Sequence, residues 1–150
     1  MRAVRYNMKT LLALVSVLLF APGAFAGVDG LLTSDTRDWQ FVEDTGGMRI
    51  GVPVQKGGKK MLPIEYDASG QTTVTRKPVT MNSGLAVRKI ETELKDGNII
   101  IRVITQVVEK TSNTGSKHFA DLSGIPRGSY EVYYETADDP KKHLGQTEVK

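Results

Sequence analysis

Few side chains in this sequence could carry metal or acid–base chemistry. The chain has no cysteine and two histidines, His118 and His143. A zinc site normally takes about three or four protein ligands, mostly His and Cys, so these two would need carboxylates such as Asp138 or Asp139. A lysine precedes each histidine and disfavours a cation nearby. We therefore interpret both histidines as exposed loop residues and predict no metal site and no cofactor.

A softer metal is the alternative, because the thioethers of Met48, Met61 and Met81 could join a histidine as copper ligands. Met48 and Met61, however, fall in apolar strand patterns, where Met is ordinary core filling. Neither Met-x-x-Met nor His-x-His spacing occurs. A periplasmic copper-type or small-ligand binding protein is therefore our second functional hypothesis, with no metal ligand assigned.

The sequence also offers little for nucleophilic or acid–base catalysis. Ser123 lies five residues after His118, but the Gly-x-Ser-x-Gly pattern is missing. A catalytic triad depends on spatial geometry that this spacing does not support. Two carboxylate pairs occur, Glu91 with Glu93 on one strand face and Asp138-Asp139 before a proline, where turn initiation is the usual role. We predict no catalytic residue and no enzymatic activity.

Two glycine pairs, Gly46-Gly47 and Gly57-Gly58, could suggest phosphate-binding loops. Neither lies in a strand-to-helix unit with the lysine and hydroxyl that a phosphate loop needs. Lys59-Lys60 gives the second pair a basic character that could contact an anionic surface. We interpret that segment as a solvated hairpin tip.

The first 26 residues have the three parts of a secretory signal peptide. A basic start with no acidic residue precedes an apolar run over Leu11–Ala21, and Ala24-Phe25-Ala26 offers small residues for cleavage. The apolar run is shorter than the ~20 residues of a bilayer span. We expect an exported chain that begins at Gly27, is periplasmic or secreted, and contains no transmembrane segment.

The charge balance argues against nucleic acid as a partner. The chain has 20 Lys and Arg and 17 Asp and Glu, and the expected leader holds three basic residues and no acidic one. The exported chain is therefore balanced in charge and has no global field to attract polyanions. Its length suits one domain. We expect a flexible arm over residues 27–38 and a single domain over 39–150.

Short alternating segments predict an all-β fold. Apolar residues recur at every second position of Met48–Val54, where Pro53 indicates a sheet edge or a bulge. Turn residues separate the segments at regular intervals, which favours an antiparallel β-sandwich of about seven to nine short strands. The other expected strands are Trp39–Glu43, Met61–Tyr66, the polar Gln71–Lys77, His118–Leu122, Gly128–Glu135 and Gly145–Val149.

The clearest pattern is a β-hairpin over Leu85–Val108 that turns at Asp96-Gly97, a dipeptide favoured in type I′ turns. Its register places Glu91 opposite Arg102 on one face. A helix from Leu85 to Asp96 is the competing interpretation, because its apolar residues also lie four apart. The partner strand is β-branched, which favours the hairpin. On the other face the expected apolar pairs are Leu94–Ile99, Ile90–Val103 and Ala86–Val107.

The segment Ala120–Tyr134 resembles the end of an immunoglobulin-like β-sandwich domain of secreted bacterial proteins. Leu122 and Ile125 match the apolar anchors at a strand end, Gly128 matches the Pro-x-Gly turn, and Tyr130 matches the tyrosine that enters the next strand. The resemblance implies a fold and no activity. It implies that Tyr130 is buried against the two anchors, with its hydroxyl bonded to the backbone of the preceding turn.

Tyr133 is the candidate surface residue. If Tyr130 and Tyr134 face the core, Tyr133 lies on the outer face between Glu131 and Glu135, where it either meets a partner or packs under a loop. We expect a non-catalytic, exported β-sandwich that binds another protein or an envelope component. An exposed sheet edge or the Tyr133 face would make the contact.

Overall fold

The computed structural model describes residues 35–108 and 115–150. The expected leader at 1–26, most of the expected arm at 27–38 and much of the polar loop between Val108 and Lys117 lie outside the described residues. Within the described part, no helix has the length and apolarity that crossing a bilayer requires.

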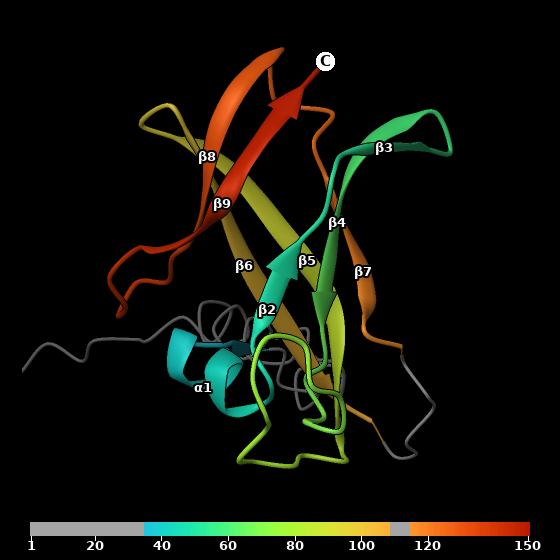
Figure 1. Ribbon diagram of the computed structural model, residues 1–150, viewed down its shortest axis with the longest axis vertical. Coiled ribbons are helices and arrows are strands. Elements are labelled where there is room, and N and C mark those ends of the chain that lie inside the picture. Colours follow the sequence, from blue (N-terminus) through green and yellow to red (C-terminus); the bar gives the residue numbers. More distant parts are fainter. Residues whose placement is uncertain (1–34, 109–114) are drawn as a thin grey trace, which may run out of the picture. The chain divides into compact units, whose positions relative to one another are not determined.

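The described chain forms two β-sheets and one short helix, α1 (Trp39–Asp44) (Figure 1). Sheet A contains β1 (Asp35–Thr36), β5 (Leu85–Lys95), β6 (Asn98–Val107), β8 (Gly128–Tyr134) and β9 (Lys142–Val149). Sheet B contains β2 (Met48–Ile50), β3 (Val54–Lys56), β4 (Lys59–Tyr66) and β7 (Lys117–Asp121). The predicted all-β class with two sheets is confirmed.

The core is built from the inner faces of both sheets, because side chains alternate between the two faces of each strand. Helix α1 adds Val42, which is fully buried. The main contributors from sheet A are Ile99, Ile101, Val103, Val132 and Tyr134, and those from sheet B are Leu62, Ile64, Tyr66 and Ala120.

Strand β6 is the centre of sheet A. Strand β5 pairs along one of its edges, while β8 and β1 pair with different parts of the other edge. Asp35 and Thr36, at the end of the expected flexible arm, pair with Thr105 and Ile104. The β6–β8 pairing is parallel and departs from the expected antiparallel arrangement. The chain crosses to sheet B as β7 between these strands, which permits a parallel return.

The hairpin β5–β6 is confirmed. Asp96 and Gly97 both have positive φ, as a type I′ turn requires, and Leu94–Ile99 and Ile90–Val103 are paired as predicted. The predicted Ala86–Val107 pair is wrong. A bulge between Val87 and Lys89 shifts the register, so that Val107 faces Leu85 and Ala86 faces Gln106.

The predicted strand over Trp39–Glu43 is wrong, because this segment forms helix α1. Asp38 is its N-cap, and its carboxylate accepts the Phe41 N–H at 2.7 Å. The apolar Trp39 and Val42, three residues apart, then share a helix face toward the core. The three-residue spacing of Trp39 and Val42 and the preceding aspartate indicate the start of a helix. The two-residue spacing of Trp39 and Phe41 also fits a strand, and it led to the wrong prediction.

The predicted strand over Met48–Val54 is interrupted. Gly51 still donates to the Pro63 carbonyl at 2.8 Å, but residues 51–53 belong to no strand, and β3 begins only at Val54. Pro53 has no N–H to donate and cannot join a ladder. Both β2 and β3 pair with the same strand, β4, so the interruption lies along one edge of sheet B.

The expected polar strand over Gln71–Lys77 is also wrong, since the segment is a loop. The amides of Val74, Thr75 and Arg76 all donate to a single carbonyl, that of Gly46, at 2.9 to 3.2 Å. Amides that converge on one oxygen cannot form a strand ladder. The loop therefore holds the turn that follows α1.

Candidate functional site

The β8–β9 ribbon carries two candidate binding surfaces, one on each of its faces. Strand β9 pairs with β8 along one edge, and no other strand of the described residues pairs with its second edge. An aromatic patch lies on the outer face of the ribbon, and a groove opens on its inner side.

The aromatic patch consists of Glu131, Tyr133, Lys141 and His143. The rings of Tyr133 and His143 lie 5.2 Å apart, and the Lys141 ammonium lies 5.8 Å from the Tyr133 ring. His143 Nε2 is 2.5 Å from a Glu131 carboxylate oxygen. Tyr133 is half-buried on the outer face of sheet A, as the alternation in β8 predicts. It packs against His143, a neighbour from the adjoining strand.

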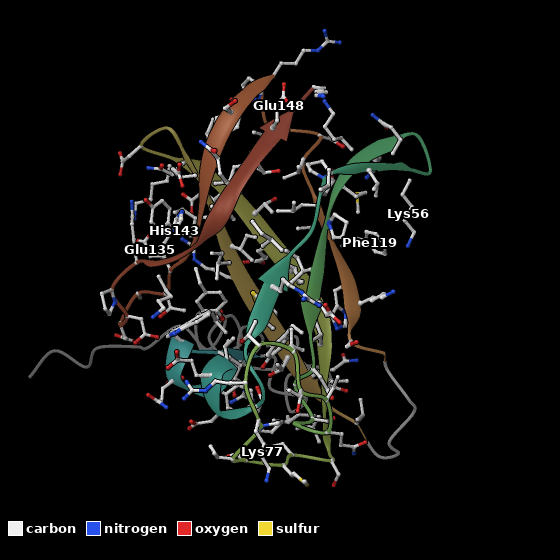
Figure 2. All side chains as sticks on the ribbon, viewed as in Figure 1. Lys56, Lys77, Phe119, Glu135, His143 and Glu148 are labelled. Carbon is white, nitrogen blue, oxygen red and sulfur yellow. The ribbon has the colours of Figure 1, made fainter. Side chains whose placement is uncertain are left out.

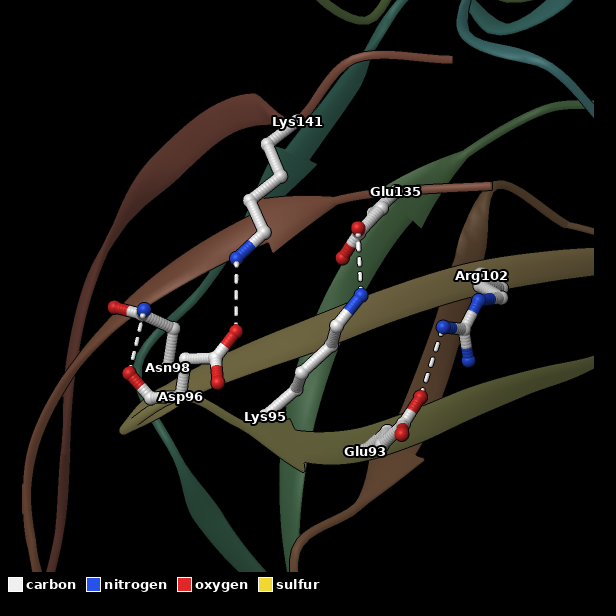
Figure 3. Close-up of polar contacts among 7 residues, drawn as sticks. All are labelled: Glu93, Lys95, Asp96, Asn98, Arg102, Glu135 and Lys141. Atoms are coloured by element: carbon white, nitrogen blue, oxygen red, sulfur yellow. Dashed lines mark hydrogen bonds and ion pairs between the residues drawn. The ribbon is translucent and has the colours of Figure 1, made fainter. Parts of the chain in front are cut away.

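The outer face of sheet A also carries ion pairs, one of which joins Lys141 of the patch to Asp96 (Figure 3). Lys95 contacts Glu135 at 2.8 Å, and Arg102 contacts Glu93 at 2.8 Å. A hydrogen bond from Lys95 lowers the pKa of Glu135, and the same contact raises the pKa of Lys95. The register places the fully buried Ile100 between β5 and β8, and the Lys95–Glu135 pair joins β5 to the residue that follows β8. The pairs therefore surround a second, smaller apolar position.

The carboxylates Asp138 and Asp139 border a cleft of about 670 Å³ next to these ion pairs. Asp139 accepts the Trp39 backbone N–H at 2.6 Å, so it caps α1 together with Asp38. The cleft contains both charge signs, with Lys95 and Arg102 among its lining residues. Among the described residues, no three His, Cys, Asp or Glu side chains converge as a metal site would require.

The groove lies between β9 and the interruption in the β2–β3 edge. Its volume is about 330 Å³. Val52, which is 80% exposed, provides apolar surface. Such exposure of large aliphatic side chains is typical of contact sites when they line a concave surface. The lining comprises Gly51, Val52, Pro53, Val54, Gln55, Lys60, Gln146, Thr147, Glu148 and Lys150.

Polar side chains point into the groove from both sheets. Along β4, Leu62, Ile64 and Tyr66 are buried, so Lys60 shares their inward phase. Gln55 pairs with Lys60 across the hairpin and points to the same side. From β9, Thr147 is only 5% exposed, and its hydroxyl has no hydrogen-bond partner. A buried hydroxyl without a partner is costly, and a bound ligand could supply one.

The two histidines are strand residues on different sheets, which corrects the expectation of loop positions. His118 is in β7 of sheet B and half-buried, while His143 is in β9 of sheet A. Nε2 of His118 donates to the Tyr66 carbonyl at 3.0 Å, and burial lowers the pKa of its imidazole. Of the methionines, Met48 is in the core and Met81 is 77% exposed in a loop. Two of the candidate copper ligands, His118 and His143, therefore belong to different sheets, and Met81 lies in an exposed loop.

The remaining candidates have local structural contacts. The Ser123 amide donates to Asp121, which also pairs with Lys59 at 3.1 Å. Hydrogen bonds from Ser123 and Lys59 lower the pKa of Asp121 to about 2. Glu91 faces Arg102 in the register as predicted, yet Glu91 pairs with Lys89 at 2.6 Å, while Arg102 reaches diagonally to Glu93.

The tip of the β3–β4 hairpin at Gly57-Gly58 is anchored as well as solvated. The Lys56 ammonium lies 3.6 Å from the centre of the Phe119 ring, and Figure 2 shows the two side chains next to each other. Lys59 is held by Asp121 on the outer side of sheet B. The next residue, Lys60, points to the opposite face of β4, toward the groove. The two adjacent lysines therefore have different surroundings.

Sequence reasoning did not identify the groove. Thr147 and Lys60 come from strands of different sheets, and their proximity depends on tertiary structure. One signal was available, because Lys60 continues the inward phase of Leu62, Ile64 and Tyr66. A lysine in the apolar phase of a strand indicates either a protected strand end or a binding site.

Comparison of the chain with protein-family models, curated proteins and solved structures gives no match.

Proposed function

We propose that this chain is an exported, non-catalytic binding module that contacts another protein or a cell-envelope component through the aromatic patch. One observation carries the proposal: Tyr133 packs against His143 on an outer strand face, with Glu131 and Lys141 at its border. An aromatic centre with a charged rim is the arrangement that protein interfaces favour. The patch has charged groups of both signs, which suits a protein surface better than a polyanion.

The test places a photo-crosslinking amino acid at Tyr133 in cells that produce the full chain. We expect one dominant adduct with a protein or an envelope component. The control places the same group at Met81, an exposed loop position. Equal labelling from both positions, or no adduct from Tyr133, would argue against the patch as an interface.

Export and an immunoglobulin-like relationship belong to the same proposal. The leader pattern of residues 1–26 supports export to the periplasm or the medium, and N-terminal sequencing of exported chain should begin at Gly27. The bond between Tyr130 and the Pro126 carbonyl supports the immunoglobulin-like interpretation of Ala120–Tyr134. An exported chain that retains Met1 would contradict the first part.

A further inference from the structure

We propose that the groove binds an extended peptide segment, which adds a strand to the open edge of β9 and places an acidic side chain against Lys60. The site is independent of the aromatic patch, because it lies on the inner side of the ribbon. It adds a ligand class, an extended acidic peptide, to the proposed binding function. The supporting observations come from strand pairing, from an unpartnered hydroxyl and from charge.

The first observation is that two open strand edges border the groove. Among the described residues β9 pairs only with β8, and β2 and β3 pair only with β4. Near Gly145 the two sheets touch, because a Cβ at that position would lie 3.2 Å from Ile50 Cδ1. The open stretch of β9 therefore runs over residues 146–149, which accommodates about four residues of an added strand at ~3.3 Å each.

The second observation is the unpartnered hydroxyl of Thr147, a residue beside the groove. It is buried and without a partner in the described structure, although the residue lies in a regular strand. Thr147 is among the residues that line the 330 Å³ groove, although its hydroxyl oxygen itself is not exposed to solvent. A peptide in the groove would satisfy this hydroxyl once the Thr147 side chain rotates toward it, which favours a polar ligand over a purely apolar one.

The third observation is the charge at the opening. Lys60 points inward and forms no ion pair among the described residues, whereas its neighbour Lys59 is paired with Asp121. The Glu148 carboxylate on β9 pairs with Lys150 at 3.5 Å. The unpaired charge that faces the groove is therefore positive, so the complementary side chain is a carboxylate. Val52, which lines the groove and is 80% exposed, provides apolar contact for a neighbouring side chain of the same peptide.

The experiment is an NMR titration of the ¹⁵N-labelled full chain with three peptides. The first is acetyl-Thr-Val-Glu-Val-Thr-amide, the second has Lys in place of Glu, and the third is the first with N-methyl groups on both valines. We expect saturable amide shifts at residues 146–149 and 52–55 with the first peptide. The second and third should bind at least about tenfold more weakly, because each loses a charge-assisted contact or a strand hydrogen bond.

Matched variants identify the contact. Lys60→Met should weaken the first peptide about fivefold or more, while Lys59→Met, on the outer side, should change its affinity less than about twofold. Thr147→Val, which conserves shape and removes the hydroxyl, provides a second variant if Lys60→Met does not fold. The proposal is overturned if the first peptide gives no saturable shift up to about 1 mM, or if Lys60→Met and Lys59→Met behave alike. Equal binding of the N-methylated peptide also overturns it, because the groove would then bind a carboxylate without strand addition.

Discussion

The hydroxyl of Tyr130 donates a hydrogen bond to the carbonyl of Pro126 at 3.0 Å. The ring lies over Gly128, where a Cβ would come within 3.2 Å of the phenol oxygen and 3.3 Å of the ring. The turn between β7 and β8 is thus closed by one side chain that packs closely over the glycine. Tyr130 itself is half-buried, and not buried as the resemblance implies, since it stands at the start of its strand.

Loss of the Tyr130 hydroxyl should therefore lower the free energy of unfolding only moderately. We expect Tyr130→Phe to lower the free energy of unfolding by about 0.5–1.5 kcal/mol, because the Pro126 carbonyl can turn to water. Tyr130→Ala should cost about 1–3 kcal/mol, less than a fully buried aromatic residue. Urea denaturation followed by fluorescence measures both variants.

Tyr133→Ala is the matched comparison on the same strand. Tyr133→Ala removes the contact with His143, and Tyr133 lies outside the main core, so we expect a cost below about 1 kcal/mol. A larger loss for Tyr133→Ala than for Tyr130→Ala would reverse the assignment of inner and outer faces in β8.

The parts of the fold that the sequence predicted well depend on local chemistry. Asp96-Gly97 can adopt the two positive φ values that a type I′ turn needs, and the β-branched partner strand favours the hairpin over a helix. The alternation of Val132 and Tyr134 likewise depends only on strand geometry. These features follow from residues next to one another in the chain.

The errors occur where distant contacts decide the structure. The amides of residues 74–76 donate to the carbonyl of Gly46, which is distant in sequence. No local sequence pattern indicates these hydrogen bonds. The bulge near Arg88 shifts the hairpin register without a glycine or proline to mark it. The groove needs β9 and the β2–β3 edge to approach from different sheets. Its inward lysine was visible in the sequence, but the side chains facing it were not.

Tyr134 should be more important for stability than Tyr130. It is fully buried, its hydroxyl donates to the Arg37 carbonyl, and the same oxygen accepts the Val103 N–H at 3.4 Å. Tyr134→Phe leaves both groups without this partner, so we expect a loss of about 1–3 kcal/mol in the free energy of unfolding. Thermal and urea unfolding of the variant provide the measurement. A variant as stable as the native chain would show that water replaces the phenol at this position.

The pKa of Tyr134 gives a pH test of the same burial. Desolvation raises this pKa to about 12. In the unfolded chain the phenol titrates near ~10, so the folded state binds more protons between these two values. Its contribution to stability is complete below pH ~10 and is lost as the pH rises toward 12. The free energy of unfolding of the native chain should therefore fall over this range more steeply than that of Tyr134→Phe.

Asp121 should stabilise the fold at neutral pH and lose that effect in acid. Its pKa of about 2 lies below the ordinary aspartate value of ~3.9, so the unfolded state binds more protons between them. The contribution is complete above pH ~3.9 and is lost as the pH falls toward 2. Asp121→Asn should be less stable than the native chain at pH 6, and the difference should shrink by pH 2.5. A constant difference between the two pH values would contradict the role of the charge.

Helix α1 has two carboxylates at its N-terminus, from residues far apart in the sequence. Asp38 accepts the Phe41 N–H at 2.7 Å and Asp139 accepts the Trp39 N–H at 2.6 Å, so each satisfies a different unpaired amide. Each substitution by alanine should cost about 0.5–2 kcal/mol. Asp139→Asn, which conserves the accepting oxygen, should recover most of the loss.

The double variant distinguishes local capping from a tertiary role. Asp139 follows β8 and fastens α1 to sheet A, whereas Asp38 acts only within its own turn. If both only cap, the two costs should add to within about 0.5 kcal/mol. We expect the double variant to lose less stability than the sum of the two single losses. Once Asp38 is removed the helix frays, so the Asp139 contact is already weakened. Urea denaturation of Asp38→Ala, Asp139→Ala and the double variant gives the coupling energy, and strict additivity would show that the two carboxylates act independently.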